Sequence, residues 1–104
     1  MRSPRVGADR RDEVLAILRA FKGERAEEFG ILELGLFGSV ARNTAGADSD
    51  VDVCIRMRMP DGFAMVHIRD ELETRLGRRV DVVRVRDRMN PLLLARIEQD
   101  GIFV

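Results

Sequence analysis

The chain has 104 residues, of which 45% are hydrophobic and 35% charged, a balance typical of one globular domain spanning 1–104 rather than of a disordered or fibrous protein. Its net charge of zero and its lack of Trp and Tyr argue against direct nucleic-acid binding. One cysteine excludes an intramolecular disulfide and a cysteine zinc site. Because no apolar leader or membrane-length apolar run is visible, we expect a cytoplasmic protein without membrane contact.

The first part of the chain predicts a helix followed by a strand. Residues 9–29 place apolar side chains at helical spacing, and Gly23 is expected to weaken this helix or to end its first half. Residues 31–37 alternate between apolar and other residues, which predicts a strand. The side chains expected on one face of this strand are Leu32, Leu34 and Leu36.

A tight turn and a second strand follow. Ser39 directly follows Gly38 and is expected to cap a short helix over residues 40–42. After a turn-rich loop, residues 50–57 predict a strand with two different faces. One face carries Val51, Val53 and Ile55, and the other carries Asp50, Asp52 and Cys54.

The last part predicts two further helices around a third strand. The second long helix covers residues 61–76 and ends at Gly77, and its inner face carries Met65, Ile68, Leu72 and Leu76. Residues 79–85 are rich in β-branched side chains and predict a strand. A final helix runs from Pro91 to about residue 99. This order predicts an α/β (α+β) domain, a small mixed β-sheet with helices packed on it.

Two aspartates on the second strand indicate a metal site. Asp50 and Asp52 are two positions apart, so their side chains point to the same side with Cα atoms roughly 6.5–7 Å apart. Like charges at this separation repel unless a cation lies between them. Mg²⁺ is commonly held by one or two carboxylates together with substrate phosphates. A pair of this kind also occurs on ordinary surface strands, so the flanking residues are needed to distinguish a metal site from an ordinary surface pair.

The flanking residues favour a nucleotide site. The opposite face of the strand is apolar, which fixes the direction of the two carboxylates. Gly38 lets the backbone approach a phosphate, and Ser39 begins a helix whose first N–H groups can hold an anion. A phosphate site and a metal site at the two ends of one short connection describe a site for a nucleoside triphosphate.

A third carboxylate stands inside the third strand. Asp81 lies between Val80 and Val82, where aspartate is disfavoured. One interpretation is an ion pair with a neighbouring arginine at position 78, 79 or 84. The other is a further ligand for the cation that activates an attacking hydroxyl, as in two-metal sites whose ions lie roughly 3.5–4 Å apart.

These motifs resemble a known superfamily. Gly38-Ser39, ten residues and then Asp50-Val51-Asp52 is similar to the signature of the DNA polymerase beta-like nucleotidyltransferases. The small size, the GSVAR opening and the SDVDV strand look most like the minimal nucleotidyltransferase (MNT) group. The resemblance covers roughly residues 31–85 and implies that group's compact mixed α/β fold.

The resemblance also implies roles for these residues. Asp50 and Asp52 would bind two Mg²⁺ ions, and Asp81 would join them on the ion that activates the nucleophile. Gly38 and Ser39 would hold the terminal phosphates of ATP.

Two further positions follow the turn. Arg42 follows the family pattern of a basic residue after Ala41, either as a phosphate contact or in a salt bridge with Asp48 or Asp50. Asn43 stands where relatives often have Gly, and it tolerates left-handed backbone angles well enough to keep the turn.

Minimal members of this family resemble antitoxins that are paired with a helical HEPN toxin and transfer AMP from ATP onto a tyrosine of that toxin. Since the chain has no Tyr, such an acceptor would lie on the partner. Two alternatives stay open: an antitoxin that acts by binding without catalysis, and a nucleotidyltransferase for small molecules or RNA.

The C-terminal helix carries three consecutive leucines, Leu92, Leu93 and Leu94, which span about 200° of helix surface. This helix therefore either faces a homo- or hetero-oligomeric partner or is wedged between layers of its own domain.

Overall fold

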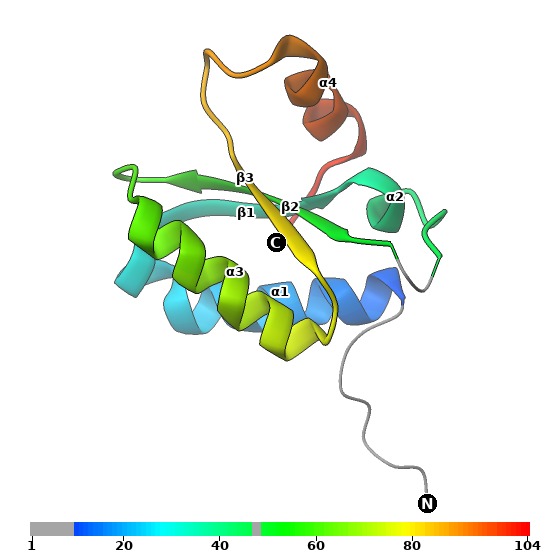
Figure 1. The fold of residues 1–104 in the computed structure, drawn as a ribbon, viewed down its shortest axis with the longest axis horizontal. Helices are drawn as coiled ribbons and strands as arrows, with labels where there is room; N and C mark the ends of the chain where they lie inside the picture. Colours follow the sequence, from blue (N-terminus) through cyan, green and yellow to red (C-terminus); the bar gives the residue numbers. More distant parts are fainter. Residues whose placement is uncertain (1–9, 47–48) are drawn as a thin grey trace, which may run out of the picture.

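The computed structural model describes residues 10–46 and 49–104 (Figure 1). The helices are α1 (Arg11–Phe29), α2 (Gly38–Ala41), α3 (Gly62–Leu76) and α4 (Pro91–Asp100), and the strands are β1 (Ile31–Phe37), β2 (Val51–Met57), β3 (Val80–Arg84) and β4 (Ile102–Phe103). No helix among these residues is long and apolar enough to cross a membrane.

The four strands form one mixed sheet in the order β3-β2-β1-β4. β1 pairs antiparallel with β2 and with β4, whereas β2 pairs parallel with β3. Figure 1 shows α1 and α3 together below the sheet and α4 above it, with α2 at one end. The expected mixed sheet with helices packed on it is confirmed.

Each face of the sheet carries its own apolar cluster. The larger one joins the sheet to α1 and α3, and its fully buried members are Val14, Leu18, Phe21, Leu34, Leu36, Val51, Val53, Ile55, Ile68, Leu72 and Leu76. The smaller one lies under α4 and consists of Phe37, Cys54, Val85, Met89 and Ile97. The predicted inward face of β2 is therefore confirmed, and its other face is covered only over part of its length.

Local capping explains both ends of α3 and the start of α4. The Asp61 carboxylate accepts hydrogen bonds from the backbone N–H groups of Phe63 and Ala64 at the start of α3. Gly77 ends that helix with φ of 66°. The Asn90 side chain caps α4 in the same way, directly before Pro91.

Three expectations about the first two strands and α1 need correction. Gly23 does not end the first half of α1, because the inward face of this helix is anchored on both sides of the glycine by packing on the sheet and on α3. Leu32 is 46% exposed, since the pairing with β2 shifts register between Ile31 and Glu33 and turns Leu32 away from the core. β2 begins at Val51, so Asp50 precedes the strand.

The short strand β4 was not expected. Leu36 pairs with Ile102 and Gly35 pairs with Phe103. A Cβ atom at Gly35 would lie only 2.9 Å from a ring carbon of Phe103, so the missing side chain leaves room for the aromatic ring. β4 therefore depends on a long-range fit that local sequence patterns do not report.

The three leucines of α4 have different surroundings, as their spacing predicted. Leu92 is 78% exposed, while Leu93 and Leu94 pack partly against the cluster under α4. Ile97 is the buried anchor of this helix.

Candidate active site

The pairing of the sheet places Asp52 between two informative neighbours. Phe37 is its register partner in β1, and Asp81 is its register partner in β3. Register partners on adjacent strands carry their side chains on the same face, and adjacent strands lie about 4.7–4.9 Å apart. Asp52 and Asp81 therefore lie side by side on the face that α4 partly covers.

Gly38 brings the backbone directly against Asp52. Its φ of 77° is a backbone conformation that other residues adopt only with strain. A Cβ atom at this position would lie against the Asp52 carboxylate, 3.0 Å from its Cγ and 3.2 Å from its Cβ. The glycine is thus required both by the turn and by the close approach of the carboxylate.

The turn after Gly38 is closed by backbone hydrogen bonds. The Ser39 carbonyl accepts from the Thr44 N–H at 2.9 Å and from the Thr44 hydroxyl at 3.3 Å. Asn43 has φ of 63°, which confirms that asparagine keeps the left-handed turn. The expectation that Ser39 caps α2 is wrong, because the helix begins at Gly38 and Phe37 occupies the cap position without a side-chain bond.

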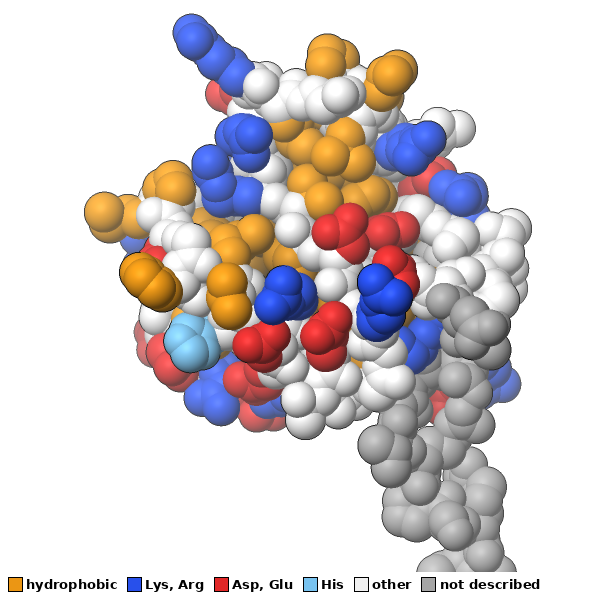
Figure 2. All heavy atoms as spheres, viewed as in Figure 1, with side chains coloured by type: hydrophobic (Ala, Val, Ile, Leu, Met, Phe, Trp, Pro, Cys, Tyr) orange, Lys and Arg blue, Asp and Glu red, His pale blue; other side chains and the backbone are white. Residues whose placement is uncertain are grey.

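A cleft of about 370 Å³ opens over these residues. Its walls come from the end of β1, from α2, from the paired strands and from α4, and its lining residues are Phe37, Gly38, Ser39, Arg42, Asp52, Asp81, Val83, Leu93 and Arg96. Figure 2 shows acidic side chains at the centre of this face beneath an apolar area under α4, with basic side chains on either side. The cleft thus combines carboxylates, cations and an apolar wall.

The pKa of the Asp52 carboxyl is raised by its surroundings in the cleft. Partial burial raises its pKa, and the neighbouring carboxylates of Asp81 and Asp50 raise it further. Arg42 and Arg96 act in the opposite direction and are weaker influences on this pKa. Negative charge is therefore incompletely compensated at Asp52, which favours the approach of a cation.

Asp50 lies outside the cleft wall. Its carboxylate is half exposed and lies 3.9 Å from Nε of Arg79. Among residues 10–46 and 49–104, no three carboxylate, histidine or cysteine groups are close enough together to form a metal-binding set as they stand. The structure thus brings together Asp52 and Asp81 of the predicted trio, and a metal role for Asp50 stays a prediction. Asp81 forms no ion pair with another described residue, which leaves its arginine interpretation without support.

Arg42 has a partner that sequence reasoning did not identify. Its Nη1 donates to Oδ2 of Asp100 at 2.7 Å, linking the end of α2 to the end of α4. The expected pairing with Asp50 is wrong, because Arg42 pairs with Asp100 and the Asp50 carboxylate lies near Arg79 instead; Asp48 lies outside the described residues. Arg42 also lines the cleft, so the proposed phosphate contact stays a prediction.

Arg96 and the apolar wall of Leu93 and Val83 were missed by sequence reasoning. The sequence contained part of the signal for Arg96. This residue directly precedes the buried Ile97 and follows Leu93 by three positions, which places Leu93 and Arg96 on one face of the helix. What the sequence lacks is the position of α4 relative to β3.

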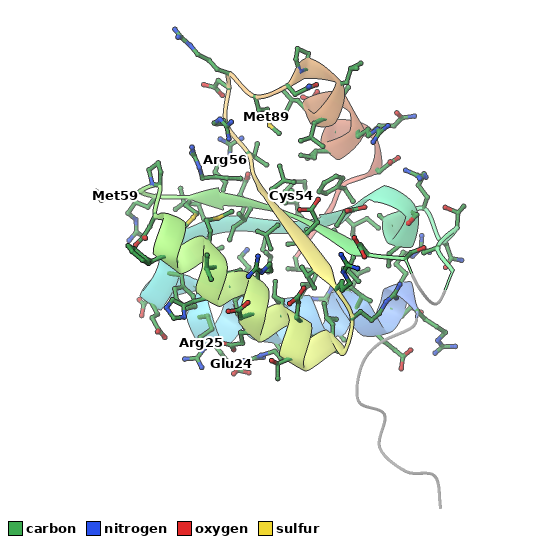
Figure 3. All side chains as sticks on the ribbon, in the orientation of Figure 1. Glu24, Arg25, Cys54, Arg56, Met59 and Met89 are labelled. Atoms are coloured by element: carbon green, nitrogen blue, oxygen red, sulfur yellow. The ribbon has the colours of Figure 1, made fainter. Side chains whose placement is uncertain are left out.

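Cys54 shares the strand face of Asp52 but belongs to the core. It is fully buried, and burial raises the pKa of its thiol to about 11. Figure 3 shows Cys54 on the sheet and Met89 nearer α4, and both belong to the cluster under that helix. Cys54 is therefore a small buried residue that packs in this cluster.

Comparison with known proteins agrees with this geometry. The family model described as a nucleotidyltransferase domain matches residues 18–104. The chain belongs to this nucleotidyltransferase family. It is 41% identical over 73 residues to the protein adenylyltransferase MntA of Thermococcus cleftensis, covering 69% of this chain and 74% of that protein. A relative from Methanocaldococcus jannaschii is 33% identical over 93 residues, which cover 88% of this chain and 95% of its own length.

Solved structures share the fold of this nucleotidyltransferase. A minimal nucleotidyltransferase is 28% identical with a TM-score of 0.75, and the match covers 89% of this chain and 94% of that one. A toxin-antitoxin crystallised with AMP-PNP is 21% identical with a TM-score of 0.66, covering 89% and 70% of the two chains. The family model and the relatives together make the chain a nucleotidyltransferase enzyme.

Proposed function

We propose that this nucleotidyltransferase transfers AMP from ATP to a hydroxyl of a partner protein, and that it acts as the antitoxin of a HEPN-type toxin. The observation that carries the proposal is the Asp52–Asp81 pair set against the Gly38 turn in one cleft. The name of the MntA relative supports protein adenylylation, and the toxin-antitoxin structures of the same fold support the partner. Because the chain has no Tyr, a tyrosine acceptor lies on that partner.

The nucleotide is proposed to bind along the cleft. The triphosphate would lie beside Gly38 and Ser39, where Arg42 and Arg96 supply positive charge. The apolar part of the wall then remains for the base.

The donor set fits Mg²⁺. Asp52 and Asp81 provide paired hard oxygen ligands, and the raised pKa of Asp52 reflects charge that a cation would compensate. Asp50 would complete the site if its exposed carboxylate turned away from Arg79. Bound magnesium, one or two ions, would neutralise phosphate charge and favour ionisation of the attacking hydroxyl.

The transfer is a displacement at the α-phosphorus of ATP. The acceptor oxygen forms a bond to that phosphorus, and the bond from phosphorus to the bridging oxygen of the β-phosphate breaks. Pyrophosphate leaves with that electron pair, and the hydroxyl proton passes to the Asp81 carboxylate and then to water. Arg42 and Arg96, which line the cleft, would stabilise the charge that develops on the leaving group.

The test compares AMP transfer from α-labelled ATP to the purified HEPN-type partner by wild type and by Asp52→Asn. We expect the variant to lose at least about 100-fold in rate while its circular dichroism spectrum stays unchanged, since an electrostatic catalytic group contributes about that much. Asp87→Asn removes an exposed carboxylate outside the cleft and serves as the matched control. Full labelling of the partner by Asp52→Asn would refute the proposal.

A second candidate, neutralisation by binding alone, is favoured by the exposure of Leu92 at the start of α4. A variant with Asn at positions 50, 52 and 81 separates the two. Cells that express the toxin survive with this variant if occlusion suffices, and they die if transfer is required.

A further inference from the structure

We propose that the free edge of β3 is the docking site for the acceptor, which binds as an extended peptide that adds a fifth strand to the sheet. The inference rests on the proposed transfer function and specifies how the acceptor reaches the site. β3 is the last strand on its side of the sheet formed by the described residues. It lies at the front of Figure 1, beside α3.

The backbone of β3 offers hydrogen-bonding groups along this edge. The Arg79 carbonyl accepts from the Val51 N–H at 2.9 Å, and the Val85 N–H donates to the Ile55 carbonyl at 2.7 Å. Odd-numbered residues therefore direct their backbone groups toward β2. Because this direction alternates along a strand, the N–H and C=O groups of Val82 point outward, where an added strand can pair with them.

The neighbour of Val82 on the same edge supports this direction. The Val80 N–H donates to a carboxylate oxygen of Glu73 at 3.0 Å, away from β2. A side chain from α3 thus closes the edge at the start of β3 and leaves the stretch from Val82 onward for a partner strand.

Strand addition would bring an acceptor hydroxyl to the carboxylates. A peptide residue opposite Asp81 points to the same face as Asp81, with the two Cβ atoms about 4.5–5.5 Å apart. Since Asp81 lines the cleft and is the register partner of Asp52, that residue would present its side chain to the transfer site. The pairing therefore selects which residue of the peptide is modified.

On the α3 side of the sheet, a pocket beside β3 can receive the next residue of the peptide. A pocket of about 160 Å³ is lined by Met65, Val66, Arg69, Asp81 and Val82. Because strand side chains alternate, a residue adjacent to the hydroxyl residue would point to this α3 side. Val66 is 47% exposed there, so an apolar side chain would cover it.

Charge identifies the peptide further. Residues 78–88 carry five arginines and two aspartates, so the segment around the edge is basic although the whole chain is neutral. The occupant we infer is an extended acidic peptide with one hydroxyl residue opposite Asp81 and an apolar residue beside it.

The experiment uses a library of synthetic acidic peptides, each with one central Ser, Thr or Tyr, labelled from α-labelled ATP with magnesium. Val82→Pro removes the outward N–H group without removing a bond to β2, and proline is tolerated on such an edge. Val82→Ala keeps that N–H and is its control. We expect Val82→Pro to raise the peptide KM at least tenfold, while the shift in melting temperature caused by magnesium and AMP-PNP stays unchanged.

A second variant covers the case in which Val82→Pro fails to fold. Val66→Asp places a charge in the α3-side pocket, and Phe63→Asp is its control because Phe63 is 84% exposed on the same helix but does not line that pocket. We expect a raised peptide KM for Val66→Asp only. Wild-type KM values in both Val82→Pro and Val66→Asp would overturn the docking site and leave the proposed function intact, whereas no labelling of any peptide or of the purified partner by wild type would overturn the proposed function itself.

Discussion

The close approach of Gly38 to Asp52 gives a quantitative prediction for Gly38→Ala. Alanine at φ of 77° costs about 1–2 kcal/mol in backbone strain. The new Cβ would also lie 3.0 Å from Cγ of Asp52, and overpacking of this kind costs about 1–3 kcal/mol. The free energy of unfolding should therefore fall by about 2–5 kcal/mol, a large part of the stability of a small domain.

A control substitution and one mutant background separate the backbone strain from the steric overlap. Gly23→Ala is the control, because a Cβ at this exposed position in α1 meets nothing within 4 Å, and the protein should gain about 0.5–1 kcal/mol. In an Asp52→Ala background the cost of Gly38→Ala should fall toward the backbone strain alone, since the Asp52 carboxylate is gone.

The assay is urea unfolding followed by far-ultraviolet circular dichroism, because the chain has no Trp or Tyr to serve as a fluorescent probe. Equal costs of Gly38→Ala in the wild-type and Asp52→Ala backgrounds would refute the close contact. A Gly38→Ala protein as stable as wild type would refute the positive φ as well.

Other consequences can be measured on the same protein. The raised pKa of Asp52 means that the folded state binds the proton of this carboxyl more tightly than the unfolded state does, so Asp52→Asn should be at least as stable as wild type at neutral pH without Mg²⁺. The difference in the free energy of unfolding between the two proteins should disappear below the ordinary pKa of Asp. Urea unfolding at stepped pH measures this difference, and an Asp52→Asn protein less stable than wild type at neutral pH would contradict the reasoning. Cys54, with its pKa raised to about 11, should resist a thiol reagent at mildly alkaline pH until the chain unfolds, and fast labelling of the folded protein would contradict its burial. A double-mutant cycle on Arg42 and Asp100 should give about 0.5–1 kcal/mol of coupling, and no coupling would mean that the pair does not hold α4. Leu92→Ser should leave the free energy of unfolding within about 0.5 kcal/mol of wild type while weakening partner capture, whereas a large loss of stability would place Leu92 in the core.

The sequence predicted those parts of the fold that local patterns encode. The apolar spacing of α1 and α3, the end of α3 at Gly77, the start of α4 at Pro91 and the alternation of β2 each carry their own signal. It did not predict the exposure of Leu32, because a register shift depends on the partner strand. It also missed β4, whose pairing depends on Phe103 fitting over a distant glycine.

The same distinction holds at the candidate site. Gly38, Asp52 and Asp81 could be found because the turn and the two strands place them by local rules. The place of Arg96 depends on how α4 lies across the sheet, which no local pattern reports. Asp50 was assigned to the site on too little evidence. The predicted strand began at Asp50 and therefore aligned its side chain with Asp52, whereas β2 begins at Val51.

Titration calorimetry with AMP-PNP and magnesium tests the central claim most directly, that the two carboxylates beside the Gly38 turn form a magnesium nucleotide site. We predict binding by wild type that requires magnesium and is lost in Asp52→Asn and in Asp81→Asn, with Asp87→Asn unchanged. Equal magnesium-dependent binding by all four proteins would contradict the account.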